Sequence, residues 1–133
     1  MKRLGILGNH LPRHCGIGTF TSHLADALTA ELPDVDSCVL AMNDAGRRHA
    51  YPSRVRFEIA EGDVASYRRA ADLLNVNHVD VLSVQHEYGI LGGRAGAPLL
   101  ALPCDLHMPI VTTLHTVRSA PNPAQLDRHG TAA

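Results

Sequence analysis

The sequence predicts a doubly wound α/β domain with a mostly parallel sheet. Short apolar runs rich in β-branched residues recur along the chain, and segments with helical periodicity separate them. The apolar runs are nearly continuous, which is typical of parallel strands that are covered on both faces. With 133 residues, the chain is long enough for one domain with a real hydrophobic core.

Five apolar segments are predicted to be the strands of this sheet. The third of them is the weakest. In chain order they are residues 4–7, 37–42, 55–59, 79–84 and 109–114. Because helical segments lie between strands, the connections can cross over the sheet and join strands in parallel.

Three segments are predicted to be helices. The first begins near Thr19, whose hydroxyl can cap a helix, and ends at Leu32 because Pro33 cannot continue it. The second runs from about Asp63, its predicted N-cap, to Val76. Its apolar stripe consists of Val64, Tyr67, Ala71 and Leu74.

The third predicted helix covers residues 98–107. Pro98 is suited to the first turn of a helix. Pro103 lies inside the segment, where it removes a backbone donor and clashes with the preceding turn at a cost of about 3 kcal/mol. We therefore expect a kink at Pro103 or an early end of this helix.

In a sheet of this kind, ligands bind at the carboxyl ends of the strands. Three loops rich in glycine, histidine and other polar residues are expected at that edge. They are residues 10–19, 85–96 and 115–123. Residues 43–53 are expected at the opposite edge, as a solvated connection.

The loop after the first predicted strand carries the glycines of the candidate site. It holds no Walker A motif, and Gly16-Ile17-Gly18 is not a complete GxGxxG fingerprint because Thr21 stands where the third glycine belongs. One interpretation is that these glycines only permit a tight turn. We favour the other, in which backbone N–H groups of Gly16, Ile17 and Gly18 bind an anion, because a strand precedes them and a helix follows.

Polar residues also follow the fourth and fifth predicted strands. Gln85, His86 and Glu87 come directly after one strand, and His115 ends the other. We expect Gly16, His86 and His115 to face one cleft, where polar side chains can bind the hydroxyl groups of a sugar. Simple loop packing, or a hydrogen bond from His115 to the backbone, is the structural alternative.

Other chemistries have weaker support. His14 beside Cys15 suggests a thiol nucleophile at a helix N-terminus, but neighbours in sequence do not have the geometry of a nucleophile and its base. Glu87 has no obvious partner carboxylate for hydrolysis of a glycoside. The nine histidines lack the spacing of metal ligands, so we predict no metal site.

Composition excludes several classes of protein. The net charge of -1 and the aromatic content of 4% do not fit a nucleic-acid-binding protein. No apolar run approaches the length of a membrane span, and the N-terminus lacks a secretory signal. The three cysteines are scattered and form no disulfide framework. We expect a reduced, cytoplasmic protein.

Three motifs of the chain are found together in one known family. They are PRHCGIGTF at residues 12–20, SVQHEYGI at residues 83–90 and MPIVTTLHT at residues 108–116. In this order they resemble the N-terminal half of the family 4 glycosyltransferases, which are retaining enzymes of the two-Rossmann-domain (GT-B) architecture. The resemblance covers residues 4–126. It implies an incomplete Rossmann-like N-terminal domain at residues 1–126. The tail at residues 127–133 ends in small and polar residues, and we expect it to be frayed.

The resemblance implies a hexosyltransferase that moves a hexose from a nucleoside-diphosphate sugar to an acceptor hydroxyl, with no further cofactor and no metal. The donor diphosphate would lie against Gly16, Ile17 and Gly18. The acceptor would contact Arg13, His86, Glu87 and Tyr88. His115 would be the catalytic residue, near the donor sugar.

Members of the family bind the nucleotide with a second Rossmann domain, which these residues do not contain. We therefore expect a truncated chain that is inactive alone and that has the missing C-terminal domain as a partner. The predicted strand at residues 109–114 would form a sheet edge, which favours a homodimer through that edge. The alternative is a non-catalytic α/β module that binds a phosphate or a partner chain.

Overall fold

The fold is that of a computed structural model, which describes residues 1–44, 49–87, 102 and 105–116. The elements of this part are β1 (Arg3–Gly8), α1 (Gly16–Glu31), β2 (Asp36–Asn43), β3 (Val55–Ala60), α2 (Val64–Val76), β4 (Val81–His86) and β5 (Ile110–Leu114). The strands form one parallel sheet in the order β3-β2-β1-β4-β5. The predicted fold class, a doubly wound, Rossmann-like α/β fold, is confirmed.

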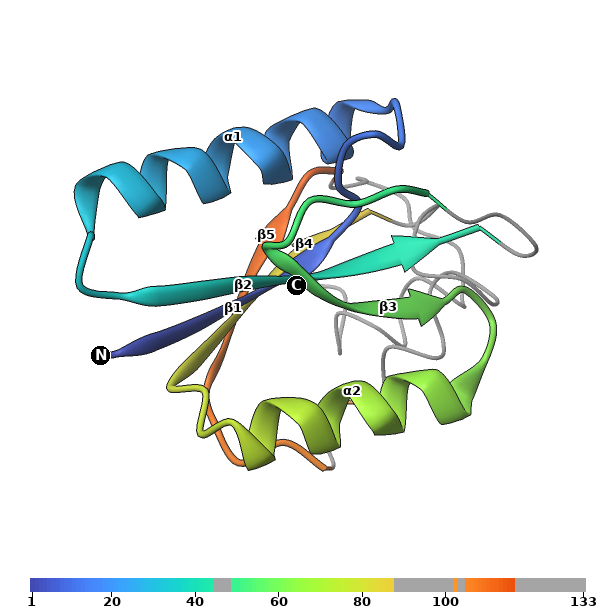
Figure 1. Cartoon of the computed structure of the whole chain (residues 1–133). Helices are drawn as coiled ribbons and strands as arrows, with labels where there is room; N and C mark the ends of the chain where they lie inside the picture. Colours follow the sequence, from blue (N-terminus) through green and yellow to red (C-terminus); the bar gives the residue numbers. More distant parts are fainter. Residues whose placement is uncertain (45–48, 88–101, 103–104, 117–133) are drawn as a thin grey trace.

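The sheet is a middle layer, with α1 on one face and α2 on the other (Figure 1). Side chains of a strand alternate between the two faces. Ile6 of β1 accordingly packs with Ala25 of α1, whereas its neighbour Leu7 belongs to the larger core that contains Tyr67 and Leu74 of α2. Both Ile6 and Leu7 are fully buried.

The first helix starts earlier than predicted. Cys15, not Thr19, is the N-cap of α1, and its Sγ accepts a hydrogen bond from the Gly18 amide at 3.2 Å. The Thr19 amide already donates to the carbonyl of Cys15 at 3.0 Å. Gly16, Ile17 and Gly18 therefore form the first turn of α1. The cap predicted for the second helix is confirmed, because Asp63 accepts from the Ala65 amide at 3.1 Å.

Strand β5 lies at one end of the sheet order, as predicted. The prediction that this strand is buried is wrong. No residue of β5 is buried, and Val111 is 56% exposed. In the described sheet only β4 pairs with it, so β5 is an edge strand there.

The connection after β2 also differs from the prediction. We expected residues 43–53 at the edge opposite the candidate site. Because β2 runs parallel to β1, its last residue, Asn43, lies at the carboxyl edge. Tyr51 of this connection lies with its ring edge-on to His10 of the loop after β1, at 6.4 Å between ring centroids. The connection is therefore part of the surroundings of the candidate site.

Several predictions fall outside the described residues. They include Tyr88 and most of the predicted site loops at residues 85–96 and 115–123. Most of the predicted helix at residues 98–107, with Pro103, and the tail at residues 127–133 also lie there. In the part of the chain that the structure describes, no helix has the length and apolar character needed to cross a bilayer.

Candidate functional site

The first turn of α1 forms one wall of the candidate site. The thiol of Cys15 accepts hydrogen bonds from the Gly18 amide at 3.2 Å and from Nδ2 of Asn9 at 3.1 Å. The Gly18 amide is therefore already used by the cap. Gly16 is exposed, and a Cβ added to it would meet no atom within 4 Å. Of the three residues predicted to bind phosphate, Gly16 and Ile17 thus carry the amides that remain for an anion.

Gly18 is a glycine for a packing reason. A Cβ at this position would lie 2.6 Å from the carbonyl oxygen of Arg13, which is shorter than any normal contact. The loop before α1 thus passes directly over the first turn of the helix. This close approach places Arg13 beside the helix N-terminus.

Arg13 is held by protein groups. Its Nη1 donates to Oδ1 of Asn9 at 3.1 Å and to the carbonyl of Met42 at 2.9 Å, and its Nη2 forms an ion pair with Asp44. The side chain is only 14% exposed. The structure thus shows Arg13, a predicted acceptor-binding residue, as a link between the loop after β1 and the end of β2.

A second polar network lies beside this link. The Tyr51 hydroxyl donates to Oδ1 of Asn43 at 2.5 Å, and Nδ2 of Asn43 donates to Glu58 at 2.7 Å. Burial raises the pKa of Tyr51, and the charge of Glu58 adds to this effect. Burial also raises the pKa of Glu61, with a further contribution from Asp44. Among the described residues, this side of the site therefore carries the carboxylates of Asp44, Glu58 and Glu61, and Arg13 is paired with the first of them.

Sequence reasoning missed Asn43, Asp44 and Tyr51 as neighbours of the site. The signal that could have found them is the position of Asn43 and Asp44 directly after a strand. Every strand of a parallel sheet ends at the same edge, so residues that follow β2 approach those that follow β1. The prediction that residues 43–53 lie at the opposite edge is wrong.

His115 joins the ends of β4 and β5 to α1. Its Nε2 lies 2.9 Å from Oε1 of Gln85. Since the amide oxygen can only accept, Nε2 carries the proton and, in the neutral ring, Nδ1 is left as an acceptor. The ring also lies edge-on to Phe20 of α1, with 4.8 Å between centroids and an interplanar angle of 79°. Next to it, Thr116 donates a hydrogen bond to Glu87.

His86 does not share a face with His115. Leu82 and Val84 of β4 belong to the core on the α2 side, and His86 has the same parity in the strand. Gln85, which contacts His115, points to the α1 side. The expectation that His86 and His115 face one cleft is therefore wrong, and Gln85 takes the place predicted for His86.

Close packing around Gly8 fixes Gln85 against α1. A Cβ on Gly8 would lie 2.9 Å from Oγ1 of Thr21 and 3.0 Å from Cβ of Gln85. Gln85 and Thr21 are both fully buried. Within the described residues, Oγ1 of Thr21 has no hydrogen-bond partner.

An open hollow of about 440 Å³ adjoins the loop after β1, between this loop, α1 and the segment before β3. His10 is one of its lining residues and is 3% exposed. Nδ1 of His10 lies 2.7 Å from the carbonyl oxygen of Leu11, so Nδ1 is the donor. In the neutral ring Nε2 is then an acceptor, and it has no partner among the described residues. The ion pair of Arg54 and Asp26, at 2.6 Å, borders the same hollow.

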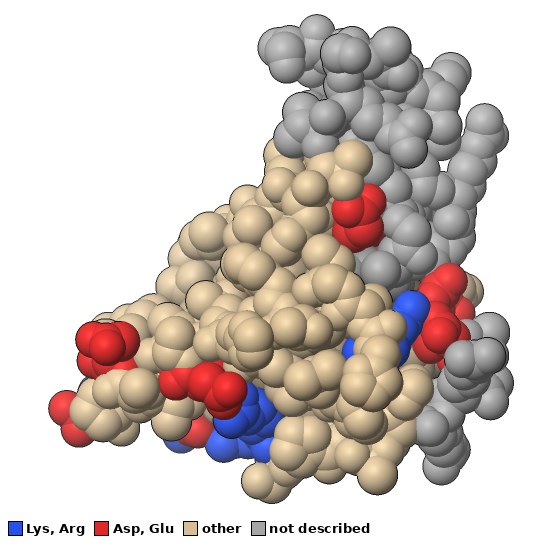
Figure 2. Space-filling view, turned by 90° about the horizontal axis from the view of Figure 1, so that it is seen from above, with Lys and Arg blue, Asp and Glu red and all other residues tan. Residues whose placement is uncertain are grey.

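On the α1 side, basic side chains lie beside acidic ones, and other acidic side chains stand apart from any basic one (Figure 2). The visible described surface shows no extended patch of one sign. Among the described residues, no group of three or more His, Cys, Asp or Glu side chains is placed to hold a metal ion.

The arrangement can therefore bind an anion at the first turn of α1 and accept a hydroxyl hydrogen at Nδ1 of His115. Both groups lie on the α1 side of the carboxyl edge. Comparisons of the chain with family models, with curated proteins and with solved structures found no match in any of the three.

Proposed function

We propose that this chain is the acceptor-side, Rossmann-like segment of a retaining glycosyltransferase that uses a nucleoside-diphosphate sugar. The supporting observation is the contact of His115 with both Phe20 and Gln85. These three residues come from the three motifs that resemble family 4 glycosyltransferases. The parallel sheet brings the motifs together at its carboxyl edge, which is where ligands bind in sheets of this kind.

The proposal gives each group a physical role. The amides of Gly16 and Ile17, at the positive end of α1, stabilise negative charge on the leaving diphosphate. Nδ1 of His115 accepts a hydrogen bond from a sugar hydroxyl, and Gln85 fixes the ring orientation that this requires. Charge stabilisation and positioning are the main contributions of protein groups to such a transfer. His86 has no role in this proposal.

A second domain, which binds the nucleotide, belongs to the proposal because the family uses two domains. The chain alone is therefore expected to bind a donor weakly and to transfer no sugar. Transfer of a hexose by the chain alone would contradict this part of the proposal.

The binding test is a titration of the isotope-labelled chain with UDP-glucose and with GDP-mannose, followed by NMR. We expect the amide signals of Gly16 and Ile17 and the ring signals of His115 to shift together. Gly16→Val is expected to weaken binding with little effect on stability, because the added side chain meets open space and covers the amides. Ala30→Val, in the last turn of the same helix, is the control for helix propensity.

The titration also distinguishes the alternative, a non-catalytic module that binds phosphate. Open amides at the first turn of α1 favour this candidate as well. In that case inorganic phosphate shifts Gly16 and Ile17 as strongly as a nucleotide sugar does, and His115 does not respond. Absence of shifts at both places would contradict both functions.

A further inference from the structure

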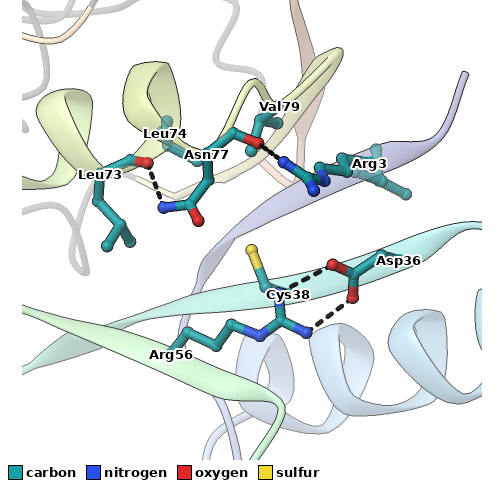
Figure 3. Close-up of a pocket in the computed structure, with 9 residues that line it drawn as sticks. Arg3, Asp36, Cys38, Arg56, Leu73, Leu74, Asn77 and Val79 are labelled. Atoms are coloured by element: carbon teal, nitrogen blue, oxygen red, sulfur yellow. Dashed lines mark hydrogen bonds and ion pairs between the residues drawn. The ribbon is translucent and has the colours of Figure 1, made fainter.

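A cavity of about 180 Å³ lies at the amino ends of β1 and β2, against the C-terminal end of α2 (Figure 3). This is the edge of the sheet opposite the candidate functional site. Its apolar lining consists of Leu4, Cys38, Leu73, Leu74 and Val79. The sulfur of Cys38 points from β2 toward the residues of α2 (Figure 3).

Three charged residues stand at the border of the cavity. Arg56 makes a two-pronged contact with Asp36, with Nη2 at 2.7 Å from Oδ1 and Nη1 at 3.1 Å from Oδ2. Arg3 donates from Nη1 to the carbonyl of Asn77, the C-cap of α2. Since Arg56 and Asp36 neutralise each other, Arg3 is the remaining charged residue of the lining. Asp80, which lies outside the lining, accepts a hydrogen bond from the backbone N–H of Arg3 at 2.8 Å and leaves the guanidinium N–H groups to the cavity border.

Arg3 also offsets the helix end. The carbonyl groups at the C-terminus of a helix carry partial negative charge, which would disfavour an anion. The guanidinium of Arg3 lies on one of these carbonyls and still has N–H groups that Asn77 does not use. An anionic group at the border of the cavity would therefore meet a cation that is held in place.

We propose that this cavity binds a small carboxylate that carries one apolar ring. A cavity of about 150 Å³ with an apolar lining accepts benzene, so the volume suits a single ring. The ring would lie among the leucines and the Cys38 thiol, which behaves as a small apolar group. The carboxylate would accept hydrogen bonds from Arg3, as arginine commonly binds such groups. The site lies apart from the candidate functional site, so its test is independent of the proposed function.

Benzoate is the probe, with benzyl alcohol as its uncharged counterpart. In a titration followed by NMR, benzoate is expected to shift the amides of Cys38, Leu74 and Asn77 in a saturable way. Arg3→Gln should weaken benzoate binding about tenfold, because a hydrogen bond to a charged group is lost. The same variant should leave binding of benzyl alcohol unchanged. Arg68→Gln, an exposed arginine of α2 outside the lining, should change neither.

A second variant and a second readout keep the test decisive if Arg3→Gln does not fold. Leu73→Trp places a large side chain in the cavity and should abolish benzoate binding. Saturating benzoate should also slow alkylation of Cys38, measured by mass spectrometry of the peptide that contains it. The proposal is overturned if benzoate causes no saturable shifts at these amides, or if benzyl alcohol binds as tightly as benzoate to the native chain.

Discussion

The imidazole of His115 lies edge-on to the ring of Phe20, with 4.8 Å between centroids. These residues belong to the segment after the last strand of the sheet and to the first helix. Nε2 of His115 is at the same time hydrogen-bonded to Gln85, which is fully buried. Three distant parts of the sequence therefore meet at one ring.

The hydrogen bond between His115 and Gln85 is expected to stabilise the folded chain. Gln85→Leu keeps the size of the side chain but leaves Nε2–H of His115 and the Ser83 hydroxyl without this partner. We expect the free energy of unfolding to fall by about 1–3 kcal/mol. Urea denaturation followed by circular dichroism measures the change.

A double-mutant cycle with His115→Phe supplies the control. If the bond is responsible, the second substitution costs less in the Gln85→Leu background than in the native chain. Additive effects of the two substitutions would contradict a direct interaction.

The two glycines of the first turn of α1 are expected to respond differently to substitution. Gly18→Ala would place Cβ 2.6 Å from the Arg13 carbonyl oxygen, so backbone must move, at a cost of about 1–3 kcal/mol. Gly16→Ala meets open space and is expected to be neutral or to stabilise by up to about 1 kcal/mol. Denaturation of the two variants side by side tests this difference, and equal effects would refute it.

Cys15 is expected to stabilise the protein as an N-cap. Cys15→Ala removes the acceptor of the Gly18 amide and should cost about 0.5–2 kcal/mol. Cys15→Ser keeps an acceptor and should retain most of the stability. Thermal unfolding of both variants is the measurement. If the Ser variant is as unstable as the Ala variant, loss of the acceptor for the Gly18 amide does not explain the lower stability.

The ion pair of Asp36 and Arg56 is expected to make stability depend on pH. The hydrogen bond from Arg56 holds the pKa of Asp36 below its ordinary value. A carboxylate with a lowered pKa stabilises the fold above its unfolded pKa of about 3.9, and this contribution is lost as the pH falls through the lower folded value. Because both side chains are about half exposed, the contribution is only about 0.2–1 kcal/mol.

Asp36→Asn tests this dependence. The variant should be less stable than the native chain at neutral pH, and the difference should shrink when both are unfolded below the folded pKa of Asp36. Asp72→Asn, an exposed position on α2, is the control. A difference that stays constant with pH would contradict the ionic origin.

The sequence predicted the strands and helices better than it predicted the contacts between side chains that are distant along the chain. The apolar runs located all five described strands, and Asp63 was recognised as a cap because its carboxylate acts on an amide two residues away. The start of α1 was missed since Thr19 is a more common cap than Cys15. A thiol that caps a helix has no distinctive sequence pattern.

Periodicity and local capping in the sequence determined where strands and helices form, because these interactions join residues close along the chain. Only the tertiary structure decided that Gln85, and not His86, meets His115. That choice depends on which face of β4 turns toward α1, and this follows from the packing of Leu82 and Val84 against the larger core. The same holds for Arg13, whose partner Asp44 follows a different strand and is brought near by the parallel order of the sheet.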